Sequence, residues 1–558
     1  MNTNATNTTD TTNTAGKPAK PAKAAKAPGI RQTMSDLHTW VGLLLGWFLY
    51  AMFLTGTVSY FRNEITQWMQ PEQPHQSQAS EPALVAQRIG DAMAHVAPQS
   101  PQWLINLPNE RSTTATVFWS PPQTGEGGRR RFESTRFDPV TGSRLEGPVR
   151  ETRGGEFFYR FHFQFHYMPV MWGRYLAGLC AMFMLVAIVS GVITHKKIFA
   201  DFFTFRWGKG QRSWLDAHNA LSVLGLPFHL MITYTGLVTL ALMYMPWASL
   251  ATDMTAQQRQ EASLQLNAFI APGKPTGQAA PLAPLADMVR QAEQRWGPGQ
   301  VGRLNITQPG DAGARVAVIR GDHGRVSFSP QFLLFDGASG ALLQAQDRVG
   351  AAAETRGVLY ALHLGRFGDL ATRWLYFLVS LAGTAMVGTG LVLWTVKRRS
   401  KLPDPDRPHF SMRLVERLNI ATIAGLSIGM AAMLWANRLL PLGMAQRAEW
   451  EIHAMFIAWG AALFWALGRP AKRAWVELLW TAAAMLALLP VANALTTDRG
   501  LHASLRHGDW VFAGMDLMLL ALAALHAHLA LRTRRHRPQA RPARAARTAA
   551  MPQTEAQA

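Results

Sequence analysis

Seven histidines lie inside or beside the first four apolar stretches of this sequence, where an ionisable side chain is costly. They are His38, His162, His166, His195, His218, His229 and His363. Ionisable groups at membrane depth indicate function by default. Imidazole is also a common ligand of metal ions and of haem iron. These histidines are therefore the candidate site residues, and the chemistry they suggest is metal or haem binding.

The chain contains a single cysteine, Cys180, which lies within an apolar block. One cysteine excludes an internal disulfide, a redox-active cysteine pair, a cysteine-ligated zinc site and an iron–sulfur cluster. Any redox cofactor must then be held by histidine, by methionine or by non-covalent contacts.

The elements that position these histidines are long apolar helices. About 20 apolar residues span the ~30 Å hydrocarbon layer of a membrane. The chain is 48% hydrophobic and 16% charged, and its apolar residues are concentrated in eight blocks. The sequence predicts helices near residues 37–61, 170–194, 217–245, 371–396, 416–437, 450–467, 474–495 and 510–531. We expect His363 to begin the fourth helix.

The net charge of +20 is distributed in alternate connections between these blocks. Lys and Arg are concentrated in the N-terminal tail, in the 195–216, 397–415 and 468–473 loops, and after Arg532. This is the positive-inside pattern of membrane proteins. It predicts a bacterial inner-membrane protein with both termini in the cytoplasm and basic loops against anionic lipid. It argues against a nucleic-acid partner.

Two long connections fall on the predicted outer side, and each is large enough for a small α+β domain. Each contains a Phe-Asp-x-x-Thr/Ser-Gly turn, at Phe137 and at Phe335. Asp caps such a turn and Gly supplies the positive φ. The predicted organisation is a disordered cytoplasmic tail (1–30), helix 1 (31–61), an outer domain (62–168), helices 2 and 3 with a basic loop (169–245), a second outer domain (246–370), helix 4 (371–400), helices 5–8 (416–531) and a basic cytoplasmic tail (532–558).

The first half of the membrane region repeats once. His38 lies 18 residues before Gly56, and His218 lies 18 residues before Gly236. The pairs Arg174/Gly191 and Arg373/Gly390 are each 17 residues apart, and Tyr159-x-x-His162 parallels Tyr360-x-x-His363. Parallel repeats predict a pseudo-twofold axis along the membrane normal. Helices 1–4 would form a pseudo-twofold core, and helices 5–8 would add to it.

The repeat sorts the histidines into pairs. His38 and His218 would face each other at the inner level, and His363 would face His162 or His166 at the outer level. Facing imidazoles in a four-helix bundle form an axial pair for b-type haem, so two haems are predicted. His166 is favoured for its proximity to the next apolar block, and the Tyr-x-x-His parallel favours His162. His195 and His229 lack histidine mates and are assigned supporting roles.

Four sequence segments resemble PepSY-associated transmembrane proteins. They are 37–46 followed by Leu54-Thr55-Gly56, then 161–168, 190–197 and 212–219, and the Phe-Asp turns resemble the PepSY domain itself. The resemblance covers about residues 31–400. It implies a relationship to iron-uptake membrane proteins and to ferric-siderophore reductases that carry haem in the membrane.

The leading hypothesis is a haem-containing electron conduit that reduces a ferric siderophore, or another ferric chelate, outside the inner membrane. The sequence shows no GxGxxG or Walker A motif, so the electron donor would be a quinol or a separate reductase. One alternative is a non-enzymatic PepSY anchor that binds an envelope protease or peptide. The other is an iron-chelate transporter, although helices 1–4 show no helix pair broken by Gly or Pro as such a transporter would have.

The charge asymmetry generates a topology prediction. A reporter fused after residue 535 should behave as cytoplasmic, and one inserted near residue 270 should behave as periplasmic. Paired alkaline phosphatase and fluorescent-protein fusions measure both positions. Phosphatase activity at the C-terminal fusion would contradict the even number of spans.

Overall fold

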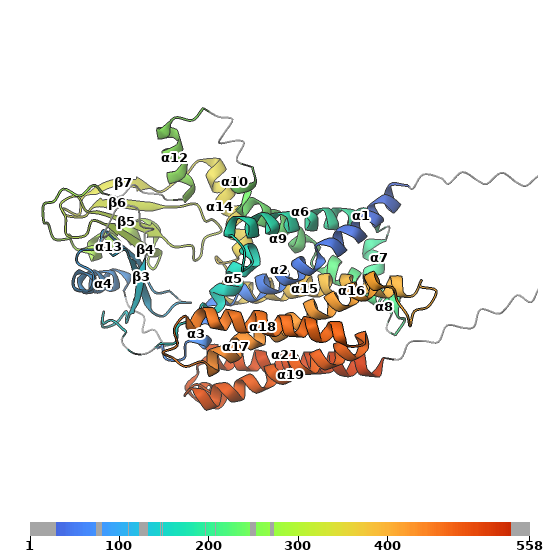
Figure 1. The fold of residues 1–558 in the computed structure, drawn as a ribbon. Coiled ribbons are helices and arrows are strands. Elements are labelled where there is room, and N and C mark those ends of the chain that lie inside the picture. Colours follow the sequence, from blue (N-terminus) through green and yellow to red (C-terminus); the bar gives the residue numbers. More distant parts are fainter. Residues whose placement is uncertain are drawn as a thin grey trace, which may run out of the picture.

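The computed structural model describes residues 29–536 with several gaps. The gaps are 74–80, 110, 122–131, 146, 148, 196, 207, 246–252 and 268–272. The predicted disordered tail therefore lies almost wholly outside the described residues, as does most of the basic C-terminal tail. A bundle of long helices carries a sheet domain at one end, which we call the sheet end (Figure 1). Helix α1 begins, and helix α21 ends, at the opposite end.

Six helices in the described part of the chain are long and apolar enough to cross a membrane. They are α6 (Val170–Thr194), α15 (Leu370–Arg399), the continuous Phe410–Leu439 helix of α16, η1 and α17, α18 (Arg447–Gly468), α19 (Ala471–Thr496) and α21 (Trp510–Arg535). Two bent pairs raise the number to eight if each pair is one span. The predicted multi-pass helical architecture is confirmed.

The bent pairs are α1 (Ile30–Leu44) with α2 (Gly46–Ser59), and α8 (Gln211–Leu224) with α9 (Leu226–Thr239). They bend by 67° and 68°. The breaks fall at Leu45 and Gly225, each seven residues after a histidine, and both residues have φ near −100° with ψ near 0°. The expectation of no broken helix pair in this region was wrong. At Gly225 the following Leu226-Pro227 gives a local reason, since Pro removes a backbone donor and disfavours the preceding helical turn.

Separate short helices precede α6 and α15 at the sheet end. They are α5 (Gly154–Gln164) and α14 (Ala351–Leu364). His363 therefore lies in the last turn of α14 and does not begin the fourth span. Gly365, with φ of 61°, ends α14, and the Asp369 side chain accepts from the backbone N–H of Thr372 to start α15. Other short helices are α3 (Arg62–Met69), α7 (Ile198–Phe202), α10 (Ala241–Tyr244), α12 (Ala256–Asn267) and α20 (Leu501–His507).

Strands from both long connections form one antiparallel seven-stranded sheet, ordered β3-β2-β1-β4-β5-β6-β7. The strands are β1 (Gln102–Asn106), β2 (Ala115–Trp119), β3 (Glu133–Phe137), β4 (Val301–Thr307), β5 (Arg315–Arg320), β6 (Phe332–Asp336) and β7 (Leu342–Gln346). The pairing of β1 with β4 joins the two segments, and α4 (Pro82–Val96) and α13 (Leu285–Trp296) contribute to the same apolar core. The sequence predicted one outer domain per segment, and the structure unites their strands in a single sheet.

The two Phe-Asp turns have the predicted chemistry. The Asp138 side chain accepts from the backbone N–H groups of Val140 and Thr141, two and three residues later. Asp336 accepts in the same way from Ala338 and Ser339. Gly142 and Gly340 have φ of 70° and 74°. Asp336 closes the β6–β7 hairpin, whereas the first turn leads to a bridge between Phe137 and Arg144.

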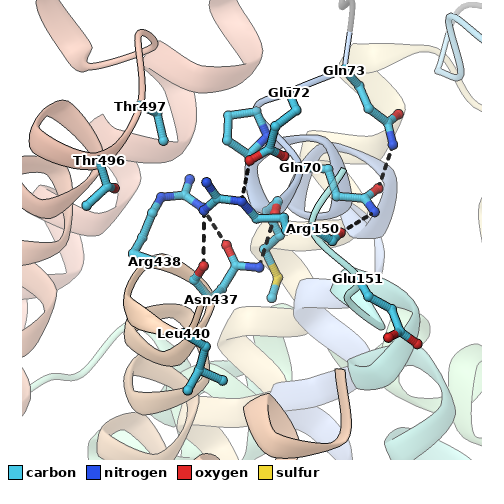
Figure 2. Close-up of polar contacts among 12 residues, drawn as sticks. Gln70, Glu72, Gln73, Arg150, Glu151, Asn437, Arg438, Leu440, Thr496 and Thr497 are labelled. Atoms are coloured by element: carbon cyan, nitrogen blue, oxygen red, sulfur yellow. Dashed lines mark hydrogen bonds and ion pairs between the residues drawn. The ribbon is translucent and has the colours of Figure 1, made fainter. Parts of the chain in front are cut away.

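The C-terminal helices are fastened to the first half of the chain by buried charged groups at the sheet end. Arg438 donates to the carbonyl of Trp68 and lies 3.7 Å above that indole ring. Arg150 donates to Glu72 and to the carbonyl of Asn437 (Figure 2). Such groups are stable in an apolar setting only when each is paired and hydrogen-bonded.

Arg447 and Glu451 form the most deeply buried ion pair of this network, with both side chains 0% exposed. Glu451 also accepts from Thr152 and Asn437, and Arg447 donates to the carbonyl of Glu151. The pair therefore links α18 to the segment that leads into α5.

Replacing one partner of this pair should be costly. Arg447→Met should lower the free energy of unfolding by about 3–5 kcal/mol, because it leaves a buried carboxylate without its counter-charge. Thermal unfolding of the purified full chain measures the change. Arg153→Met is the matched control, because Arg153 is 61% exposed and pairs with Glu449 at the same end. Its effect should stay below about 1 kcal/mol, and equal effects would contradict the assignment.

Candidate functional site

Two pairs of histidine rings face each other in the first half of the bundle. His38 on α1 faces His218 on α8 with ring centroids 6.2 Å apart. His162 on α5 faces His363 on α14, also with ring centroids 6.2 Å apart. The planes are inclined by 68° in the first pair and by 29° in the second. The structure thus brings together four of the seven candidate histidines. Two lie on the first helices of the bent pairs, and two lie on the short helices at the sheet end.

All four rings are held by the same backbone contact. Each Nδ1 lies close to a carbonyl oxygen of a neighbouring long helix: His38 to Ala187 at 2.8 Å, His218 to Met386 at 2.9 Å, His162 to Met52 at 2.7 Å and His363 to Ile232 at 3.0 Å. A carbonyl oxygen only accepts, so Nδ1 carries the hydrogen and donates. The lone pair of each neutral ring is then on Nε2, the usual arrangement of a histidine that binds a metal.

A glycine stands four residues after each of these carbonyls. The glycines are Gly191, Gly390, Gly56 and Gly236, which face His38, His218, His162 and His363 respectively. A Cβ at these positions would lie 3.2, 3.1, 2.8 and 2.9 Å from the facing ring. The helix surface is therefore flat where each imidazole lies against it, and a side chain there would push the ring away from its carbonyl.

The spacing within each pair suits one metal ion between the rings. Two imidazoles that bind one metal through Nε2 at about 2 Å place their ring centroids about 6.3 Å apart. Among the described residues, no group of three or more His, Cys, Asp or Glu side chains could hold a metal ion. Within the described ranges of the chain, each pair therefore offers two ligands and no third of these residue types. That ligand set fits an iron whose remaining ligands come from a porphyrin, as in b-type haem.

A large cavity surrounds the second pair and reaches the sheet end, where Arg62, Arg111, Arg366 and Arg373 line it; we call this end its mouth. Its empty volume, which includes open solvent at its edge, is about 1310 Å³. His162, His363, Gly56 and Gly236 line it together with mainly apolar side chains. An apolar cavity with a few convergent polar groups is the usual form of a cofactor site.

The remaining three histidines lie outside the facing pairs. The ring of His166 stacks on Phe456 at 5.6 Å between centroids, so His162 and not the favoured His166 faces His363. His195 contacts Asn219, with 2.8 Å between its Nε2 and the amide nitrogen. His229 is buried on the first turn of α9 and its ring meets that of Phe53 edge-on.

Two parts of this site were not identified from the sequence. The repeated glycines were noted as markers of the repeat, but their contact with the histidines was not predicted. Arginines at the cavity mouth were also missed, because they come from three segments far apart in the sequence, at Arg62, at Arg111 and at 366–373. The signal that could have revealed the glycine contacts was the equal 18-residue spacing from His38 to Gly56 and from His218 to Gly236.

Comparisons with known proteins agree with the membrane architecture. Residues 35–397 match the family model described as the PepSY-associated TM region. A protein of Pseudomonas aeruginosa, described as uncharacterized, is 26% identical over 369 residues. The similarity covers 63% of this chain and 89% of that protein.

The glycine contacts predict a measurable loss of stability. Gly56→Ala and Gly236→Ala should each destabilise the protein by about 1–3 kcal/mol, because the new methyl group overpacks the facing ring. Gly42→Ala is the control in the same helix pair, where a Cβ meets nothing within 4 Å. It should stabilise the helix by about 0.5–1 kcal/mol. Thermal unfolding compares the three variants, and a neutral result at Gly56 and Gly236 would contradict the contact.

Proposed function

This chain belongs to the PepSY-associated transmembrane family, and we propose that it is a haem-containing electron conduit of the bacterial inner membrane. It would reduce a ferric chelate, such as a ferric siderophore, on the outer side. His38 and His218 would hold an inner haem, and His162 and His363 an outer one. The observation that carries the proposal is the equal 6.2 Å spacing of the two facing pairs.

The residues at each level are suited to binding haem. The Nδ1–carbonyl contacts fix the ring orientation and leave Nε2 as the donor atom. The glycines keep the neighbouring helices close without intruding on the ring. Haem, when bound, supplies one-electron transfer, and the protein supplies ligands, a dry surrounding and a tuned potential.

The pseudo-twofold arrangement belongs to the same proposal. His38 and Gly56 are each 180 residues before His218 and Gly236. Within each repeat, the first histidine contacts the glycine of the second long helix and the second histidine contacts the glycine of the first. A twofold axis along the bundle would relate these contacts and place one iron on the axis at each level.

Direction follows from the proposed topology. The cavity around His162 and His363 reaches the sheet end, and the charge distribution assigns that end to the outside. The outer pair would then deliver electrons to the chelate, while the pair at His38 would receive them from a quinol or a separate reductase. His229 lies on the bent helix pair between His218 and Gly236, where its ring contacts that of Phe53.

The broken helices are a specific observation that favours the transporter alternative, because transporters often bind their substrate at such breaks. Each break lies between two of the histidine contacts. In a transporter, or in an anchor for a protease or peptide, these contacts would only pack the helices and would not supply metal ligands. Apo-protein of full stability would favour either alternative.

The proposal is tested with single histidine variants in sealed vesicles. Purified wild-type protein should contain two b-type haems, and with the electron donor confined inside it should reduce an external ferric chelate. His162→Ala and His363→Ala should each lose the same haem and at least 90% of external reduction, because removing one strong axial ligand releases the iron or shifts its potential. The inner haem should remain reducible.

His166→Ala is the matched control, because it removes a histidine four residues from His162 that does not face His363. It should keep both haems. The double variant of His38→Ala and His218→Ala should lose no more haem than either single variant. Different haems lost by His162→Ala and His363→Ala would contradict the pairing.

A further inference from the structure

The mouth of the cavity around His162 and His363 is strongly cationic. Arg62, Arg111, Arg366 and Arg373 line it. Among the described residues that line the cavity, none is Asp or Glu. The arginines come from the start of α3, the β1–β2 connection, the α14–α15 connection and the first turn of α15. All four therefore converge on one end of an otherwise apolar cavity.

The carboxylates behind these arginines only partly neutralise them. Glu64 is shared, because its two oxygens lie 3.2 Å from Nη2 of Arg111 and 2.5 Å from Nη1 of Arg373. The Nε groups of Arg111 and Arg373 are buried without a hydrogen-bond partner. Arg62 and Arg366 reach Glu156 and Asp322 at 3.3 and 3.6 Å. In the part of the chain that the structure describes, these four guanidinium groups share three carboxylates, and one of them, Glu156, also lies 3.1 Å from Arg160.

Burial makes this excess of positive charge costly. Burial, followed by the nearby Arg366, lowers the pKa of Arg62 to about 10, and burial also lowers the pKa of Arg111. A guanidinium that has lost water is stabilised best by a carboxylate bound through two parallel hydrogen bonds. The mouth is therefore suited to a ligand that presents carboxylates to it.

The cavity also specifies where the rest of such a ligand lies. Away from the arginines it is lined by Leu49, Met52, Phe53 and Met184, and by the two imidazoles, whose ring centroids are 6.2 Å apart. A flat apolar molecule with two carboxylates on one edge fits this distribution. Haem b has that form, with two propionates on one edge of the ring.

We infer that Arg62, Arg111, Arg366 and Arg373 bind the propionates of the outer haem and fix its orientation, with the propionate edge toward the sheet domain. This inference rests on the proposed function. Positive charges near the propionates also favour the ferrous state. The arginines would therefore make the outer haem the better electron acceptor, which directs electrons outward.

The test measures the midpoint potential of each haem in the purified full chain, with no chelate present. Arg62→Gln and Arg366→Gln should each shift the reduction equilibrium of the outer haem about tenfold toward the ferric state, which is about 59 mV for one electron. The outer haem is identified as the one lost in His363→Ala. The inner potential should not change. Arg366→Lys should recover part of the shift, because it restores the charge without the two parallel hydrogen bonds.

Arg153→Gln is the matched control, because Arg153 directly precedes α5, is 61% exposed, pairs with Glu449 instead of a carboxylate of the four arginines and does not line the cavity. It should leave both potentials unchanged. Unchanged haem content and potentials in Arg62→Gln and Arg366→Gln, with weaker binding of an anionic ferric chelate only, would overturn the inference and assign the arginines to the chelate. Wild-type protein without haem would overturn the proposed function as well, so the two failures are distinguishable.

Discussion

The contact between an imidazole and the carbonyl four residues before a glycine is the constraint on which the rest of the membrane region depends. It occurs four times with Nδ1–oxygen distances of 2.7–3.0 Å. The contact needs three things at once: a histidine at the right height, a helix surface without a side chain, and a second helix close enough to present the ring. Because a Cβ at Gly56 would lie 2.8 Å from the His162 ring, the close approach and the glycine are inseparable.

The breaks in the helices and the short helices at the sheet end meet these requirements. The bends at Leu45 and Gly225 redirect α1 and α8 so that His38 and His218 reach each other, while α2 and α9 present Gly56 and Gly236 to the other pair. Since α5 and α14 are separate from the spans that follow, His162 and His363 can be oriented independently of those spans.

The surrounding elements hold these short helices in place. The sheet joins both long connections through β1 and β4, so α5 and α14 extend from one domain. The C-terminal helices contact the same region through buried ions, with Arg447 bonded to the carbonyl of Glu151 just before α5. A buried ion network is costly to break and therefore resists displacement. We interpret the C-terminal helices as support for the pair at the sheet end.

The sequence by itself determined the membrane class and the positions of six spans, because length and hydrophobicity alone are enough to specify a crossing. It did not show that the other two predicted spans are bent pairs. The equal spacing from His38 to Gly56 and from His218 to Gly236 also identified the candidate pairs. Only the tertiary structure decided that His162 rather than His166 faces His363, since α5 ends at Gln164 and Phe165, with φ of 55°, turns the chain before His166. It also decided that strands from the two long connections share one sheet, and that arginines from three distant segments line one end of the cavity. These features depend on contacts between residues far apart in the chain, and no local pattern or periodicity specifies which distant surfaces meet.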